Sequence, residues 1–175
     1  IAPSASKAER NWTIEGYTSI ADYAVSKGFN VILCGGPSET ETQLGSAIQS
    51  TAQSTLSSLI GQTSLKQMLS LLKKTDIVIA PDTGPAHMAV TQGTPVIGLY
   101  AHSNPKRTGP YLYQDYIVDV YHQQLLKQYS KTDSQLPWGT RVKGKDLMKD
   151  ISIESVIAQF DRICEDFNII AKQPA

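Results

Sequence analysis

The stretch DIVIAPDTGPAHMAV, Asp76 to Val90, decides the fold. Its apolar run, Ile77 to Ala80, has the length of a buried strand, and the polar cluster Asp82 to Gly84 follows it almost at once. Pro85 then stands where a helix is expected to begin, a position that suits proline because the first helical N–H has no partner in any case. The pattern predicts a strand, a tight turn and a short helix.

The same alternation continues on both sides of this stretch. Apolar runs at 30–36 and 95–100 predict two further buried strands. Helical spacing of apolar residues predicts helices over 13–27, ending at Gly28, and over 152–167. Two Ser-x-x-Glu/Gln capping boxes predict helices that begin after Ser38 and after Ser64. Strands that alternate with helices predict an α/β fold, a Rossmann-like parallel sheet with helices on both faces.

Composition narrows the function classes. With 175 residues and 41% hydrophobic residues, the chain 1–175 is expected to form a single domain with a real core. Lysine plus arginine equals aspartate plus glutamate at 16 each, so no global charge favours a nucleic-acid partner. Cys34 and Cys164 lack metal or disulfide spacing and are expected to be core thiols in a reducing compartment.

No run approaches the roughly 18 to 20 apolar residues of a membrane span, and the first residues lack the apolar centre of a signal peptide. These features predict a cytoplasmic protein. The chain begins at Ile1, in what reads as the last residues of a strand, so a fragment of a longer protein is expected.

The segment Ala101 to Asp150 differs from the rest. It is rich in tyrosine and carries eight lysines and arginines against five aspartates, which makes it locally basic. Its apolar runs are scattered, the best being Tyr116 to Val120. We expect a polar insertion or an interface region here rather than core.

The glycine-bearing turns Gly35-Gly36 and Gly84-Pro85 fall at the carboxyl ends of predicted parallel strands, where ligands of such sheets bind. The unpaired N–H groups of a helix amino terminus suit a phosphate or diphosphate there. Asp82 is then expected to accept hydrogen bonds from loop N–H groups or a ligand hydroxyl, and His87 to donate to a phosphate oxygen or simply to pack. An ordinary junction in which Asp82 and Thr83 cap the helix explains the same residues.

The run SLKQMLSLLKKTDIVIAPDTGPAHMAVTQGTPVIGLY, 64–100, resembles the heptosyltransferase family, the ADP-heptose:lipopolysaccharide glycosyltransferases. That family places Asp-Thr-Gly-Pro-x-His between a strand and a helix, and Gly-x-Pro before the next strand. Further pieces follow in the family's order: PSASKAERNW, VILCGGPSETE, RTGP and MKDISIESVI. The segment 111–145 matches the family least. The resemblance implies the carboxyl-terminal half of a two-domain GT-B glycosyltransferase, with the amino-terminal acceptor domain absent from this chain.

The resemblance also implies roles for individual residues. It assigns binding of the donor diphosphate and sugar to the loop at 82–85, with His87 just behind it. It assigns the same ligand to the first loop, where Arg10 stands in place of the family's usual lysine and Ser6 is a nearby hydroxyl. For the nucleoside it implies Glu39 on the ribose, preferred to Glu41 because the capping box occupies Glu41, and Thr63 near the adenine.

Simpler interpretations stand beside these roles. Arg10 and Glu39 also fit solvated surface charges, and Trp12 fits a lid over the core better than a base-stacking platform. His102 and His122 have no partner pattern and are expected at the surface.

By resemblance, the reaction transfers heptose from ADP-heptose to the lipopolysaccharide inner core with inversion. The catalytic base is expected in the amino-terminal domain, so no catalytic residue is assigned here. The chain contains no Asp-x-Asp, which predicts no metal requirement, and no cofactor is expected. The expected location is the cytoplasm, with peripheral contact at the inner face of the inner membrane. Alternatives are a GT-B transferase or epimerase that uses a UDP-sugar, and a non-enzymatic nucleotide-binding module.

Overall fold

The computed structural model describes residues 1–171. Its strands form two parallel groups, one of β1 (Ile32–Leu33) with β2 (Ser57–Ser58), and one in the order β3 (Val78–Pro81), β4 (Val96–Tyr100) and β5 (Val118–Asp119). Val78 lies opposite Val96 in the register of β3 and β4. The strands predicted over 76–82 and 95–100 are thus confirmed, and the strand predicted over 30–36 is present but shorter.

The first two residues join the groups. The Ile1 amine donates to the Ile32 carbonyl at 2.7 Å, and the Cys34 N–H donates back to the Ile1 carbonyl at 2.9 Å. On the other side the Ala2 N–H donates to the Ile79 carbonyl at 3.0 Å. Residues 1–2 therefore lie between β1 and β3 as the end of a strand, as the sequence predicts, and they link the two groups into one hydrogen-bonded series.

The helices begin at the predicted signals. Thr13, Ser38, Ser64 and Ser152 each accept a backbone N–H at a helix start, and Gly28, with φ of +89°, follows the end of the first helix. The α-helices are α1 (Ile14–Ser26), α2 (Glu39–Thr51), α3 (Leu65–Lys74), α4 (Gly84–Thr91), α5 (Pro105–Thr108), α6 (Tyr121–Tyr129) and α7 (Ile153–Asp166). Short 3-10 turns are η1 (Ala8–Arg10), η2 (Gln114–Tyr116), η3 (Asp133–Gln135) and η4 (Leu147–Asp150).

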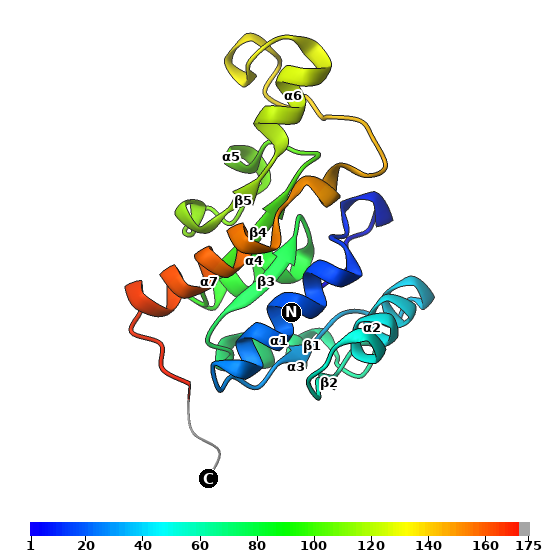
Figure 1. Ribbon diagram of the computed structural model, residues 1–175, viewed down its shortest axis with the longest axis vertical. Helices are drawn as coiled ribbons and strands as arrows, with labels where there is room; N and C mark the ends of the chain where they lie inside the picture. The colour runs from blue at the N-terminus through cyan, green and yellow to red at the C-terminus, as the bar shows by residue number, and fades with distance from the viewer. Residues whose placement is uncertain (172–175) are drawn as a thin grey trace.

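Both faces of the sheet are covered, because alternate strand side chains point to opposite sides. Ile79, Ile97 and Leu99 join a core with α1 and α7, whereas the intervening Val78 and Val96 join a second core with α3 and α4. Figure 1 shows α1 and α7 side by side in front of β3 and β4. The predicted α/β fold with helices on both faces is confirmed.

The expectation of a polar insertion over 101–150 is wrong for its inner part. Residues 118–119 form β5, which extends the sheet beyond β4, and Val118 is buried. Tyr121, Leu125 and Val142 form a small separate core. Only the outer part projects from the body of the molecule as a lobe, residues 121–146, which carries α6 in Figure 1. The sequence analysis also missed β2, a short strand of serines.

Both cysteines are free thiols, and burial raises the pKa of the Cys34 thiol, which lies in the core as predicted. Cys164 is half-buried on α7. Across 1–171, none of the helices combines the length and apolar character that crossing a membrane requires.

Candidate functional site

The predicted site residues lie at the edge where the parallel strands end. The loops after β1 and β2 touch there, since the Gly61 N–H donates to the Gly35 carbonyl at 3.1 Å. The loop after β3 is fastened to the first loop of the chain, because the Thr83 hydroxyl donates to the Ser4 carbonyl at 3.1 Å. This edge brings residues from distant parts of the sequence together, as expected for an open parallel sheet.

Arg10 and Asp82 form an ion pair at the centre of this edge. The Arg10 Nη1 lies 3.5 Å from Asp82 Oδ2, and their side chains are only 12% and 14% exposed. The buried Nε of Arg10 has no hydrogen-bond partner. A guanidinium has five N–H donors, and among the described residues only Asp82 accepts from the Arg10 side chain. The interpretation of Arg10 as a solvated surface charge is therefore wrong.

Asp82 obtains its partners from side chains. Besides Arg10, its Oδ2 accepts the Ser103 hydroxyl at 2.9 Å, and the loop N–H groups expected to bind it do not contact it. The alternative of a capped junction is also wrong, since Thr83 is the N-cap residue of α4 but its side chain makes no cap bond. The first N–H groups of α4 thus lack a side-chain cap and are free to bind a ligand.

Gly84 and Pro85 open α4, with proline in its favoured first turn. Gly84 is exposed, and a Cβ placed on it would meet no atom within 4 Å. The space before this helix terminus is therefore open to a ligand. His87, one turn into α4, is also exposed.

The remaining predicted residues share this edge but make no described contact with the Arg10–Asp82 pair. Ser6 is exposed in the first loop, and Glu39, exposed at the start of α2, accepts a hydrogen bond from Gln43. Glu41 is engaged by the Gly36 N–H at 2.8 Å and the Ser38 hydroxyl at 2.7 Å, which agrees with the choice of Glu39. The Thr63 hydroxyl is buried without a partner. The roles of Ser6, Glu39 and Thr63 stay predictions.

Trp12 belongs to the core and not to a base-stacking platform. It is 3% exposed, its Nε1 donates to the Ile151 carbonyl at 3.0 Å, and its ring packs edge-on against Tyr17. The interpretation as a lid over the core is confirmed.

Sequence reasoning missed His102 and Ser103, which follow β4 at the same edge. The expectation that His102 lies at the surface is wrong, because it is 5% exposed and its ring nitrogens face the Glu9 carbonyl at 2.9 Å and the Val142 carbonyl at 3.2 Å. A lone histidine carries no spacing signal, but its place directly after a buried strand could have indicated it. His122, also expected at the surface, has a side chain that is 38% exposed, and its Nδ1 lies 2.9 Å from Asp119 Oδ1.

A cavity of the described chain lies elsewhere. About 350 Å³ in volume, it is lined by the amino ends of β1 and β3, together with Ile1 and Phe160. It contains none of the predicted site residues, and ligands of open parallel sheets bind at the opposite end of the strands. The ion pair and uncapped helix therefore mark the candidate site. Within residues 1–171, three or more histidine, cysteine or acidic side chains nowhere gather into a potential metal site.

Comparison with known proteins identifies the family of the chain. Residues 1–138 match the model of glycosyltransferase family 9 (heptosyltransferase). The chain is 46% identical over 163 residues to the lipopolysaccharide core heptosyltransferase OpsX of Haemophilus influenzae, covering 93% of this chain and 47% of that protein. It is 25% identical over 118 residues to lipopolysaccharide heptosyltransferase 2 of Salmonella typhimurium, covering 65% of this chain and 34% of that protein. The chain thus spans about half the length, or less, of these curated relatives.

Solved structures share the fold. The E. coli ADP-heptose lps heptosyltransferase II superimposes with a TM-score of 0.74 at 20% identity, over 96% of this chain and 46% of that one. A glycosyl transferase family 9 structure from Veillonella parvula gives the same TM-score and identity over 93% of this chain and 44% of that one. These likenesses identify the architecture as the Rossmann-like part of a longer GT-B glycosyltransferase fold.

Proposed function

The chain belongs to glycosyltransferase family 9, and from that premise we propose that it is the donor-binding part of a heptosyltransferase. The reaction proposed is transfer of heptose from ADP-heptose to the lipopolysaccharide core, with inversion at the sugar carbon. The activities of the relatives OpsX and lipopolysaccharide heptosyltransferase 2 support this choice. The observation that carries it is the Arg10 guanidinium, held beside the open amino terminus of α4 with donors to spare.

The chemistry of the leaving group explains this arrangement. As the glycosidic bond breaks, negative charge grows on the departing ADP. Arg10 and the uncapped N–H groups at the start of α4, those of Gly84 and Ala86, stabilise that charge, and they are held in place before the reaction begins. The Asp82 carboxylate does not repel the diphosphate outright, because Arg10 and Ser103 already engage it.

The other donor contacts follow the family resemblance. Ser6 and His87 donate to the diphosphate or sugar, Glu39 accepts the ribose hydroxyls, and Thr63 contacts the adenine. The buried hydroxyl of Thr63, which has no hydrogen-bond partner among residues 1–171, supports its part in this set. No residue of this chain is assigned as the catalytic base.

The proposal extends to what lies outside this chain. An amino-terminal acceptor domain supplies the base, and the lipopolysaccharide core is the acceptor. The protein is placed in the cytoplasm, with peripheral contact at the inner face of the inner membrane. The chain's coverage of about half of each relative supports a partner domain.

Nucleotide selectivity tests the donor assignment. ADP is expected to raise the unfolding midpoint of the protein more than UDP at equal concentration, and Asp82→Asn, which weakens the hold on Arg10, is expected to lessen the ADP effect. A larger effect of UDP would favour the alternative UDP-sugar transferase or epimerase, and no effect of either nucleotide would reject the nucleotide site.

Metal dependence is a separate test. Because the positive charge at the diphosphate comes from Arg10 and α4, ADP affinity is expected to be the same with EDTA as with Mg²⁺. A large loss of affinity in EDTA would overturn the metal-independent mechanism.

A further inference from the structure

His102 occupies an unusual hydrogen-bonding position two residues after the end of β4. It is 5% exposed, and both of its ring nitrogens face backbone carbonyl oxygens, Nε2 that of Glu9 at 2.9 Å and Nδ1 that of Val142 at 3.2 Å. Among residues 1–171, neither of these carbonyls has another described donor. Two acceptors therefore flank one imidazole.

The proton count of the ring decides how many of these contacts are hydrogen bonds. A neutral imidazole has one N–H and one lone pair, so it can donate to one carbonyl while its lone pair faces the other. An imidazolium donates from both nitrogens. Val142 is buried, so leaving its carbonyl without a donor is costly, and both carbonyls receive a donor only when the ring is protonated.

The bridge holds the turn that carries Arg10. Glu9 is the residue before Arg10 in η1, so the bond from Nε2 fixes the backbone of that turn, and the bond from Nδ1 ties it to the projecting lobe at Val142. The next residue, Ser103, donates to Asp82, the counterion of Arg10. His102 thus holds the backbone next to Arg10, and Ser103 holds the Asp82 carboxylate.

The charges around His102 favour coupling to an anion. Arg10 and Asp82 line the same small pocket as His102 and carry opposite charges. Tyr100 lines it too, and burial, with the nearby Asp82 carboxylate, raises the pKa of its hydroxyl so far that it stays neutral. Glu9 itself and the two neighbours of Val142, Arg141 and Lys143, are exposed. An imidazolium therefore leaves one net positive charge among these packed side chains, and an anion bound at Arg10 would favour that charge.

We propose that His102 is a positioning residue whose protonated ring fixes the Arg10 turn, so that proton binding at His102 and diphosphate binding at Arg10 strengthen each other. The coupling rests on the proposed function, whereas the bridge itself does not. Coupling between two binding events is reciprocal, so a bound diphosphate also favours the protonated ring.

The bridge can be tested without a ligand or a variant. In ¹⁵N-histidine spectra of the free protein at pH 6, both ring nitrogens of His102 are expected to carry protons that exchange slowly with water, unlike those of exposed His87. An ordinary histidine gains its charge in this pH range. One protonated nitrogen at every pH from 5.5 to 8 would overturn the bridge.

ADP affinity at pH 6 and pH 8 tests the coupling in the wild type, His102→Gln and the control His122→Gln. The titration of ADP itself affects all three alike. Loss of one charge-assisted hydrogen bond is worth about tenfold in affinity, so His102→Gln is expected to bind ADP about tenfold more weakly at pH 6 and nearly as well as the wild type at pH 8.

The control is expected to follow the wild type at both pH values. An equal loss in His102→Gln at both pH values would show a merely structural role and overturn the coupling. If none of the three proteins binds ADP, the proposed function and the coupling are both rejected. If the spectra still show His102 doubly protonated, the bridge is supported.

Discussion

Arg10 is the residue on which the donor site depends most. Where the family usually has lysine, this chain has a planar guanidinium that binds Asp82 through Nη1 and, in the proposed site, binds the diphosphate through its other donors. A lysine ammonium is a compact charge, so its contact with Asp82 would compete with its contact with a phosphate. The arginine and its aspartate partner are therefore best understood as one unit.

Arg10→Lys keeps the charge but loses the forked geometry, and we expect it to weaken ADP binding about tenfold, the effect of losing one hydrogen bond to a charged group. Arg10→Met removes the charge and is expected to weaken binding further. Calorimetric titration with ADP measures both effects. Arg162→Lys, at an exposed position of α7, is the matched control and should bind ADP as the wild type does. Wild-type affinity in Arg10→Met would remove Arg10 from the site.

At the scale of helices, substitutions of two glycines are expected to have different effects on stability and on ADP binding. A Cβ on Gly16 of α1 would overlap the Trp12 indole, so Gly16→Ala is expected to destabilise the fold by about 1–3 kcal/mol through overpacking. A Cβ on Gly84 of α4 meets open space, so Gly84→Ala should leave stability within about 0.5 kcal/mol of the wild type yet weaken ADP binding. Thermal unfolding and ADP titration of both variants distinguish them, and unaltered ADP affinity in Gly84→Ala would argue against a ligand at this terminus.

Asp22 fastens α1 to the segment that leads into β2. Its carboxylate accepts the N–H groups of Gln53 at 3.0 Å and Ser54 at 2.8 Å. Burial acts to raise the pKa of Asp22, but these two hydrogen bonds outweigh burial and hold that pKa below its ordinary value. A lowered pKa in the folded state stabilises the protein above the ordinary carboxyl range, and this stability is lost as pH falls through the folded-state pKa.

Asp22→Asn is therefore expected to lower the unfolding midpoint at pH 7, and the difference from the wild type should shrink as pH falls below about 3.9, the ordinary aspartate value. Unfolding curves at several pH values measure this change. Glu165→Gln, an exposed carboxylate on α7, is the control and should follow the wild type throughout. A difference that does not vary with pH would show that the Asp22 charge is irrelevant.

The elements that the sequence predicted are those whose signals are local. β3, its turn and α4 follow from one contiguous stretch, and the caps at Ser38 and Ser64 act within four residues. β2 and β5 have two residues each and are strands because they pair with β1 and β4. No local sequence pattern reveals that pairing. α6 buries its apolar side against Val142, a contact made only once the lobe is folded.

The same division applies to the site. Asp82, Thr83 and Gly84 were predicted because a strand, a turn and a helix terminus mark them in sequence. His102 and Ser103 were missed because their importance lies in contacts with Glu9 and Asp82, made across the fold. A residue whose role is to hold another residue has no signal of its own.

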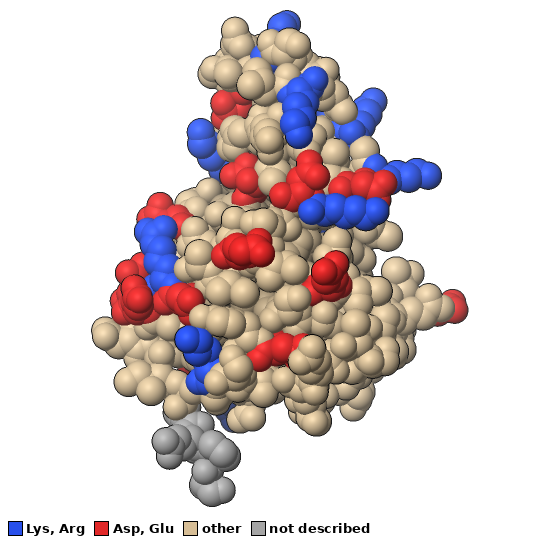
Figure 2. All heavy atoms as spheres, in the orientation of Figure 1, with Lys and Arg blue, Asp and Glu red and all other residues tan. Residues whose placement is uncertain are grey.

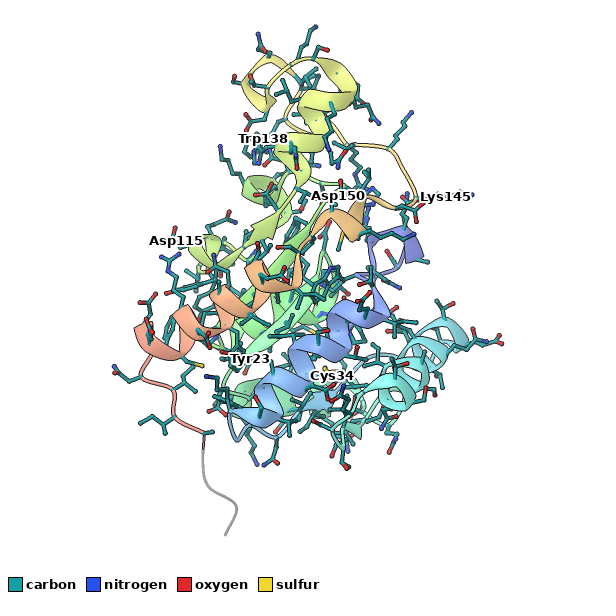
Figure 3. All side chains as sticks on the ribbon, viewed as in Figure 1. Tyr23, Cys34, Asp115, Trp138, Lys145 and Asp150 are labelled. Carbon is teal, nitrogen blue, oxygen red and sulfur yellow. The ribbon has the colours of Figure 1, made fainter. Side chains whose placement is uncertain are left out.

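At the scale of the whole molecule, charge is balanced in sum but not in space. The chain has equal numbers of basic and acidic residues, yet Figure 2 shows Lys and Arg gathered on the projecting lobe. Arg141, Lys143 and Lys145 are exposed there, and no ion pair within the described residues engages them. Figure 3 places Lys145 at the outer edge of its loop, and exposed Trp138 lies on the same lobe. Such a surface suits an anionic partner outside this chain.

We expect this lobe to face the phosphorylated acceptor in the full-length enzyme. Lys143→Glu combined with Lys145→Glu should then raise the KM for acceptor about three- to tenfold at low salt, since exposed charges contribute modestly and are screened by salt. The kcat and the KM for the nucleotide sugar should not change. Lys73→Glu with Lys74→Glu, at the far end of α3, reverses the same charge away from the lobe and is the control. Steady-state kinetics at two ionic strengths measure the effect, and an acceptor KM equal to that of the control would exclude the lobe from acceptor binding.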